Sequence, residues 1–239
     1  MKKFLVVATA LSGLLAFVDS ASAADPVVES AYDWTGFYAG VQAGVAFTDS
    51  NEGVDVNGYN SLGEVVDLDS ETDFIGGATL GYNFQANQIV FGIEADASYL
   101  GYESSNNSAF FGGDTEYSAQ ADWLGTVRAR AGLAFDNSLI FVAGGLAISD
   151  LEYSVDDDSI APPGTNAINA SKDRSLGWTI GGGFEQAFAD NMSFKVEYLY
   201  VDFAGGTASG IADVGGLAFD FDFDDTQIHV VRAGLNWSF

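Results

Sequence analysis

The most unusual chemistry of this sequence is a set of ionisable side chains that stand inside otherwise apolar segments. The set consists of Glu94, Asp96, Asp122, Arg128, Arg130, Glu185, Lys195, Glu197 and Arg232. Within each segment they occupy alternate positions, so on an extended chain they share one face. Acids and bases confined together away from water pair with one another, because an unpaired charge there is costly. The spacing predicts a mutually neutralising network of ion pairs, and a filter that selects ions by their charge is the alternative.

A general base for nucleophilic catalysis has one candidate, His229, which is the single histidine of the chain. It would have to stand beside a nucleophile that it can activate. Cysteine is absent, and His229 shares its alternating positions with Val231 and Phe239, on the face opposite Arg232. We therefore expect a surface histidine and a protein without catalytic residues. An enzyme that modifies lipids is the remaining alternative.

Two acidic runs contain the oxygen ligands that calcium and magnesium prefer. They are Asp156-Asp157-Asp158 and the alternating run Asp220 to Asp225. Neither run has the turn glycine and the terminal glutamate of an ordered calcium loop. We expect solvated charge here, with weak and diffuse binding of divalent cations as the alternative. The sequence predicts no dedicated metal site and no cofactor.

Eight segments carry the alternation, each about ten residues long, which is the length that a tilted strand needs to cross the hydrocarbon of a bilayer. They span residues 37–47, 74–84, 89–99, 122–135, 139–149, 178–188, 192–200 and 231–239. A charge that faces the middle of a bilayer costs about 2–4 kcal/mol, and the charged residues of these segments lie on their polar faces. The pattern favours lipid outside and a polar interior. A soluble lipocalin-like barrel, whose charges would face outward, is disfavoured.

The connections between these segments alternate between short and long. Residues 85–88, 136–138 and 189–191 are short and rich in Asn and Asp, as tight hairpins require. Residues 48–73, 101–116, 150–175 and 204–226 are long and hold most of the acids. The pattern predicts an all-β fold: an eight-stranded, antiparallel, up-and-down transmembrane β-barrel with long acidic outer loops and short periplasmic turns. We expect the loops to be too polar to form a compact structure.

The beginning of the chain predicts export. Lys2 and Lys3 precede an apolar stretch over residues 4–18, and Ala21-Ser22-Ala23 fits a cleavage site. The stretch is shorter than the roughly 18 residues that a membrane-spanning helix needs. We predict a cleaved signal peptide over residues 1–23 and a barrel domain over 24–239, of which 24–33 form a periplasmic N-terminal segment.

Aromatic residues mark the ends of the predicted strands. On the side of the short turns they are Trp34, Phe84, Phe135, Phe188, Trp237 and Phe239; on the other side they are Phe47, Phe74, Tyr99 and Trp178. Two such belts are typical of the interfaces of a membrane barrel. The formal net charge of −26 argues against a nucleic acid as a partner.

Several stretches resemble a known family. Trp34 to Gly40, Trp123 to Phe135, Gly177 to Gly181, Val196-Glu197-Tyr198 and Arg232 to Phe239 are similar to the porin-like small outer-membrane proteins of alphaproteobacteria. The resemblance covers essentially the whole chain after the predicted signal peptide. It implies an eight-stranded barrel, an abundant surface-exposed protein, and a C-terminal signal, Trp237 and Phe239, that the outer-membrane assembly machinery recognises. It supplies no catalytic or ligand-binding residue, and the acidic loops depart from the family.

These observations together predict an integral, multi-pass protein of the outer membrane of Gram-negative bacteria. We expect a structural role in envelope integrity, an interaction role at the cell surface, and contact with outer-membrane lipid and lipopolysaccharide. A narrow, cation-preferring diffusion channel is the alternative, because the negative loops would concentrate cations at its mouth.

Overall fold

The computed structural model describes residues 32–109, 115–157, 168–172, 175–211 and 216–239. The predicted signal peptide and most of the predicted periplasmic segment lie outside these residues. No helix within the described ranges is long and apolar enough to cross a membrane.

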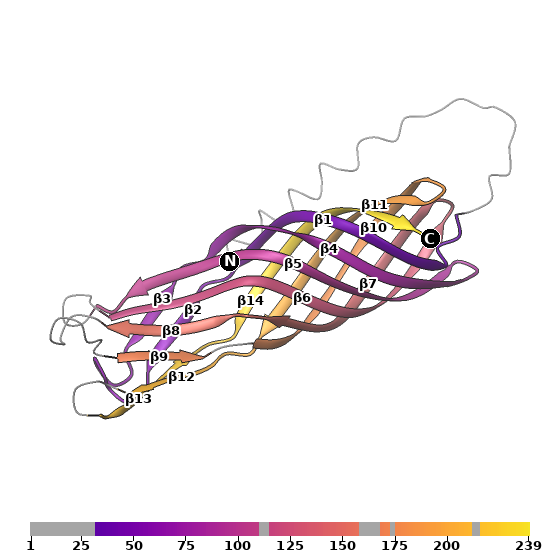
Figure 1. The fold of residues 1–239 in the computed structure, drawn as a ribbon. Helices are drawn as coiled ribbons and strands as arrows, with labels where there is room; N and C mark the ends of the chain where they lie inside the picture. Colours follow the sequence, from indigo (N-terminus) through magenta and orange to yellow (C-terminus); the bar gives the residue numbers. More distant parts are fainter. Residues whose placement is uncertain (1–31, 110–114, 158–167, 173–174, 212–215) are drawn as a thin grey trace, which may run out of the picture. The chain divides into compact units, whose positions relative to one another are not determined.

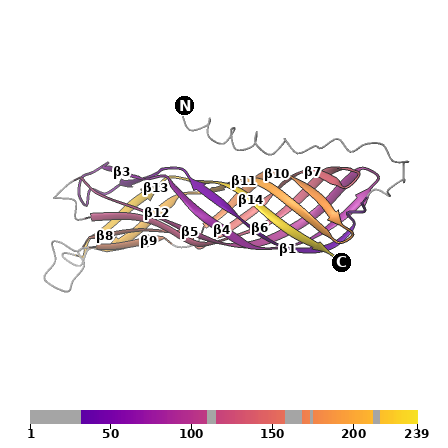
Figure 2. The same ribbon diagram turned by 90° about the horizontal axis from the view of Figure 1, so that it is seen from above.

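Eight antiparallel strands form a closed ring of backbone hydrogen bonds (Figure 1). Each strand pairs with the next one in the ring, and the last pairs with the first, so the ring leaves no free edge. In chain order the ring strands are β1 (Gly36–Thr48), β4 (Glu71–Ala86), β5 (Ile89–Asn107), β6 (Thr115–Phe135), β7 (Ser138–Ser149), β10 (Ser175–Ala189), β11 (Met192–Phe203) and β14 (Thr226–Ser238). Figure 2 shows these strands crossing at an angle on the near and far walls of the ring, as the tilt of a closed barrel requires.

The outer wall of the ring is apolar. Val41, Phe74 and Val142 are each more than 60% exposed, whereas Arg128 and Lys195 are at most 1% exposed. This is the inverse of a soluble protein, in which a large exposed apolar surface is rare. The alternation seen in the sequence therefore turns its polar face inward.

Tight turns join the ring strands at one end. Two residues separate β4 from β5, β6 from β7 and β10 from β11. In the first two turns Asn87 and Asp136 adopt positive φ angles of 57° and 50°. Asn and Asp tolerate this left-handed conformation better than other residues with a side chain do, which explains their presence in these turns.

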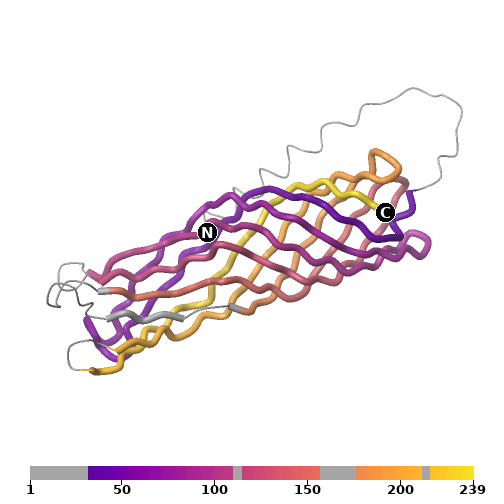
Figure 3. The backbone as a smooth tube through the Cα atoms, viewed as in Figure 1, coloured from indigo at the N-terminus to yellow at the C-terminus, as the bar shows by residue number. Residues whose placement is uncertain are grey.

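The four long connections are not loops without structure, and this part of the sequence prediction is wrong. They contain six further strands: β2 (Asn51–Asp55), β3 (Val65–Leu68), β8 (Glu152–Asp157), β9 (Ile168–Lys172), β12 (Gly206–Ile211) and β13 (Ala218–Phe223). These pair in the order β8, β9, β12, β13, β2 and β3, starting from the extended end of β6. We call this the outer sheet. Figure 3 shows β5 and β6 running on from the ring beside it.

The outer sheet folds because its acids also alternate with apolar residues. In β13, Phe221 and Phe223 are buried while Asp222 between them is exposed. The buried rings pack closely: the centroids of Tyr153 and Phe223 are 4.8 Å apart, and those of Tyr117 and Phe221 are 5.7 Å apart. Average hydrophobicity hides this core, because each acid reaches solvent while its neighbours in the sequence pack inward.

One seam of the outer sheet is closed by side chains and not by a backbone ladder. β3 lies beside the outer part of β5, where Ser104 donates a hydrogen bond to the carbonyl oxygen of Asp69 at 3.0 Å. Asn106 donates through its side-chain amide to the carbonyl oxygen of Asp67 at 2.9 Å. These bonds hold the last strand of the outer sheet against the ring.

A buried ring of the outer sheet should contribute far more stability than an exposed apolar residue of the same region. We expect Phe223→Ala to lower the free energy of unfolding by about 3–5 kcal/mol, because it leaves a cavity beside Tyr117 and Tyr153. Urea titration of the refolded protein in detergent, followed by limited proteolysis of the outer strands, measures this effect. Leu217→Ala is the control, since Leu217 is 63% exposed. Equal stability of the two variants would show that no packed core exists there.

Candidate functional site

The interior of the ring holds a network of buried charges. β5 turns Glu94 and Asp96 inward, and the facing strand β6 does the same with Arg128 and Arg130. Glu185, Lys195, Glu197 and Arg232 point inward from β10, β11 and β14. The structure therefore brings together all the charged residues singled out from the sequence except Asp122. We call these residues the lumen network.

Asp122 is exposed and does not belong to the lumen network. The pairing between β5 and β6 slips by one residue between Tyr99 and Tyr102, so Asp122 and Trp123 both face outward. The backbone N–H groups of these two residues donate to one carboxylate oxygen of Asp150, at 3.0 and 3.1 Å. Strict alternation failed as a guide here because a register irregularity changes which residues face inward.

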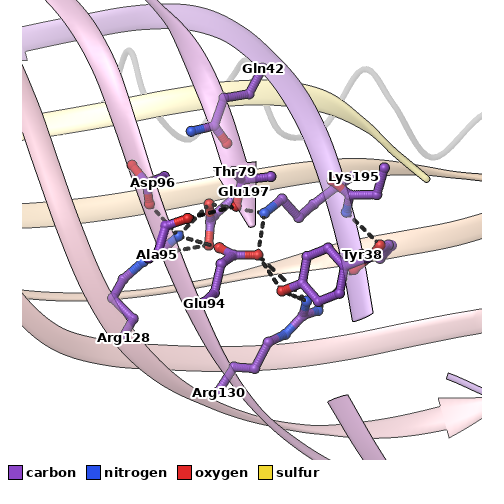
Figure 4. Close-up of polar contacts among 12 residues, drawn as sticks. Tyr38, Gln42, Thr79, Glu94, Ala95, Asp96, Arg128, Arg130, Lys195 and Glu197 are labelled. Carbon is purple, nitrogen blue, oxygen red and sulfur yellow. Dashed lines mark hydrogen bonds and ion pairs between the residues drawn. The ribbon is translucent and has the colours of Figure 1, made fainter. Parts of the chain in front are cut away.

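Arg128 lies at the centre of the lumen network (Figure 4). Its guanidinium donates to Glu197 Oε1 at 2.6 Å and to Asp96 Oδ2 at 3.0 Å, and it also bonds Glu94 directly across the β5–β6 ladder. One base thus neutralises three acids in part, which a planar guanidinium with five N–H donors can do.

Arg232 and Lys195 complete the compensation of the same acids. Arg232 donates to Asp96 Oδ1 at 3.0 Å and to Glu197 Oε2 at 2.8 Å. Lys195 donates to Glu94 Oε2 at 2.8 Å. Figure 4 shows the Lys195 and Tyr38 side chains converging on Glu94 from opposite strands. Every one of these acids therefore meets more than one donor.

Arg130 forms a second part of the network. It donates to Glu185 Oε2 at 2.9 Å and to the Tyr38 hydroxyl at 2.9 Å, and Tyr38 donates in turn to Glu94 Oε2 at 2.6 Å. The guanidinium carbon of Arg130 lies 4.1 Å from the centroid of the Phe141 ring. This stacking adds a cation–π contact to the ion pair.

Neutral side chains supply the remaining hydrogen bonds, and sequence reasoning did not assign them to the site. Thr126 donates to Asp96 at 2.6 Å, and Ser193 and Asn236 donate to Glu185 at 2.6 and 2.7 Å. Their inward parity was visible in the sequence, but their pairing with particular acids across the lumen was not. Neighbouring glycines make room: a Cβ on Gly81 would overlap the Tyr38 ring, and one on Gly92 would press on Arg130.

Apolar layers lie on both sides of the lumen network. Toward the tight turns the interior is filled by Trp34, Val90, Leu139, Phe141 and Ala187. Toward the outer sheet it is filled by Ile75, Leu100, Leu124, Leu199 and Val230, which continue into the aromatic core. The network holds equal numbers of acids and bases, so the arrangement is a neutral polar layer between two apolar ones. Trp34 belongs to this interior, so its expected place in an outward belt is wrong.

His229 faces outward, at the end of β14 nearer the outer sheet. Its Nδ1 lies 2.7 Å from the Tyr198 hydroxyl, and its Nε2 lies 3.5 Å from Asp49 Oδ2. Neither partner is a serine or threonine nucleophile. The C-terminal aromatics Trp237 and Phe239 also point outward and are 51% and 82% exposed.

The acidic run on β13 is held by hydroxyl groups. Ser209 donates to Asp220 at 2.7 Å, and Thr207 donates to Asp222 at 2.7 Å. In the other run, Asp158 and the side chain of Asp157 lie outside the described residues. Within the described part of the chain, no group of three or more acidic, histidine or cysteine side chains could hold a metal ion.

Buried tyrosines line the outer core beyond the ring. Burial raises the pKa of Tyr153 to about 12, although hydrogen bonds from Thr226 and Asn51 oppose this shift. The Tyr153 hydroxyl lies 2.7 Å from Thr226 Oγ1. This tyrosine therefore stays neutral at any physiological pH and acts as a hydrogen-bonding side chain.

Comparison with known proteins gives consistent matches over most of the chain. Residues 9–239 match the family described as the outer membrane protein beta-barrel domain. A 31 kDa outer-membrane immunogenic protein of Brucella melitensis biotype 1 is 31% identical over 243 residues, covering 93% of this chain and 95% of that protein. A 22 kDa outer membrane protein of Rhizobium leguminosarum bv. viciae is 32% identical over 176 residues, covering 74% of this chain and 67% of that protein.

Solved structures with a similar fold are more distant in sequence. The outer membrane protein OprG of Pseudomonas aeruginosa is 16% identical with a TM-score of 0.55, over 87% of this chain and 99% of that one. The outer membrane protease OmpT of Escherichia coli is 10% identical with a TM-score of 0.51, over 87% and 98% of the two chains. At these identities the likeness concerns the fold alone.

The pair of Arg130 and Glu185 allows a clean test of charge compensation. We expect Arg130→Met to lower the free energy of unfolding by about 3–5 kcal/mol, because it leaves the Glu185 carboxylate buried without its base. Adding Glu185→Gln should recover part of this loss, since the glutamine oxygen can still accept from Ser193 and Asn236.

Urea titration of the refolded single and double variants measures this coupling. The control is Asp222→Asn, which removes an exposed charge and should change the stability by only about 0–1 kcal/mol. A double variant less stable than Arg130→Met, by the full cost of Glu185→Gln measured alone, would mean that the two charges do not compensate each other.

Proposed function

We propose that this chain, which belongs to the outer membrane protein β-barrel family, is a closed structural barrel that supports the cell envelope and displays its outer sheet at the cell surface. The relatives confirm two predictions made from the sequence, the family and the location in the outer membrane of a Gram-negative bacterium. The specific role within that membrane is our proposal.

The observation that carries the proposal is the filled interior. The acids and bases of the lumen network bond to one another, and apolar layers cover the network on both sides. An ion that crossed the ring would have to displace these pairs and enter apolar packing, which costs several kcal/mol. A barrel of eight strands is just wide enough for side chains to fill. A structural role follows more directly from this interior than transport does.

The exposed aromatics support a transmembrane orientation. Phe84, Phe135, Phe188, Trp237 and Phe239 are exposed near the tight turns, and Phe74, Tyr99, Trp123 and Trp178 are exposed near the outer sheet. We take these as the two interfacial girdles, and the parts of the ring strands between them as the membrane-spanning segments. The tight turns then face the periplasm and the outer sheet faces the exterior. Lipid and lipopolysaccharide surround the ring in this orientation.

The outer sheet suits a surface-interaction role. It is rigid, rich in exposed acids such as Asp222, and covers an aromatic core. The Brucella relative is named an immunogenic protein, and a folded outer sheet in this chain would likewise be accessible from outside. Catalysis is not part of the proposal, because the described partners of His229 are Tyr198 and Asp49.

Conductance separates a closed barrel from the narrow cation channel. We expect the wild-type protein to give no stable single-molecule current steps in a planar bilayer. Arg128→Ala combined with Arg232→Ala should produce steps, because both bases that compensate Asp96 are lost. Asp220→Asn, outside the ring, serves as the control for insertion without opening. A stable, cation-selective step of the wild-type protein would overturn the structural proposal in favour of the channel.

The end of the chain should act in assembly. Phe239 donates its backbone N–H to the carbonyl oxygen of Phe37 at 2.9 Å, while its ring contacts no core. We expect deletion of Phe239 to reduce the amount of folded, heat-modifiable protein in the outer membrane several-fold, because the assembly machinery loses the terminal aromatic. The fold of the purified, refolded variant should change little. Normal membrane levels after the deletion would contradict this role.

A further inference from the structure

A second group of acids lies inside the ring, at its outer end, and is not part of the lumen network. Glu71 and Asp73 stand two residues apart at the beginning of β4 and share the face that carries Ile75 further along the strand. Ile75 is 1% exposed and belongs to the interior core, so this face points inward. Both carboxylates are only partly buried. Ions can therefore reach them from the outer side.

These two acids differ from the lumen network in charge balance. Every acid of the network has a base within ion-pair distance. Among the described residues, no ion pair joins Glu71 or Asp73 to a base. Two inward carboxylates on one strand repel each other unless a cation stands between them. This end of the ring thus carries a local excess of negative charge.

Buried oxygen atoms around the two acids have no hydrogen-bond partner within the described residues. They are Thr48 Oγ1, Asp73 Oδ2 and the Tyr102 hydroxyl oxygen. Thr48 is 1% exposed and lies directly opposite Glu71 in the β1–β4 ladder. Buried polar atoms are nearly always paired, so unpaired oxygens in one place call for a ligand.

Tyr102 lies on the other side of the same acids. It is 2% exposed, on the part of β5 that has passed the girdle residue Tyr99, and so lies outside the membrane-spanning segments. Burial raises the pKa of Tyr102, and the charges of Glu71 and Asp73 add to this shift. Its hydroxyl is therefore neutral and close enough to feel both carboxylates. Thr48, Glu71, Asp73 and Tyr102 thus come from three adjacent strands.

We propose that Glu71, Asp73, Thr48 and Tyr102 form a binding site for one calcium ion at the outer end of the ring. We call it the mouth site. Two carboxylates and two neutral hydroxyls are oxygen ligands of the kind that hard divalent cations take, and calcium tolerates an irregular arrangement completed by water. A bound ion would neutralise the acid pair and join β1, β4 and β5. The inference does not depend on whether the barrel is closed.

The overall charge of the chain favours occupancy. The formal net charge of −26 raises the local concentration of cations around the outer sheet. Diffuse attraction alone would act on all exposed acids alike. The mouth site differs from the acids of β13, because Asp220 and Asp222 already accept hydrogen bonds from Ser209 and Thr207.

Matched double variants test the mouth site. The full chain without its signal peptide is refolded in detergent, stripped with EDTA and titrated with calcium chloride, and thermal unfolding is followed by heat-modifiability. We expect calcium to raise the midpoint of the wild-type protein. Glu71→Gln with Asp73→Asn should weaken the calcium response at least tenfold, whereas Asp220→Asn with Asp222→Asn should retain it. Both pairs remove two charges spaced two residues apart on one strand.

Thr48→Val separates a ligand from a merely buried hydroxyl. Without calcium this variant should be as stable as the wild type, since it removes an unpartnered polar atom and keeps the side-chain shape. With calcium it should bind several-fold more weakly. Terbium luminescence, sensitised by nearby tyrosine, gives an independent reading of occupancy and should fall in Tyr102→Phe.

Two results would overturn the mouth site. An equal loss of the calcium response in both double variants would mean diffuse attraction to the acidic surface. Absence of any calcium response in the wild-type protein would mean that water alone fills the site. Single-channel recordings without current in all these variants would leave the closed-barrel proposal intact in either case, so the two proposals fail separately.

Discussion

Compensation of charge inside a narrow, closed ring is the constraint on which the rest of this structure depends. A strand that faces lipid on one side must place every charge on the other side, and the interior is too small to hydrate them all. Arg128 and Arg232 therefore bond Asp96 and Glu197 in a shared network. Removing any one partner leaves a buried charge without compensation, so the network holds together as a unit.

The layers above and below the network follow from the same constraint. Water that reached the ion pairs would weaken them, and the apolar packing around Phe141 on one side and Leu124 on the other keeps it out. The upper layer continues without a break into the aromatic core of the outer sheet, through Tyr102 and Tyr153. Interior and outer sheet therefore share one continuous core, and the acids of the outer sheet reach solvent only because this core fixes their direction.

The mouth of the ring is where this rule is relaxed. Glu71 and Asp73 lie on the inward face but have no base among their described neighbours, while Thr48 presents a buried hydroxyl beside them. A protein that compensates each charge of its lumen so thoroughly has little physical reason to leave two acids uncompensated a few residues further along. A cation that comes from outside would complete the pattern without adding a base to the sequence.

The sequence by itself determined the eight ring strands, their tight turns and which face of each strand turns inward, because period-two alternation is a local property that lipid on one side makes strict. It could not reveal that Asp122 faces outward, since a one-residue slip between β5 and β6 depends on the partner strand. Nor could it pair Arg130 with Glu185 across the lumen, or show that Phe221 and Phe223 build a core with Tyr117. Contacts between strands distant in the chain exist only once the ring has closed, and only the tertiary structure decides them.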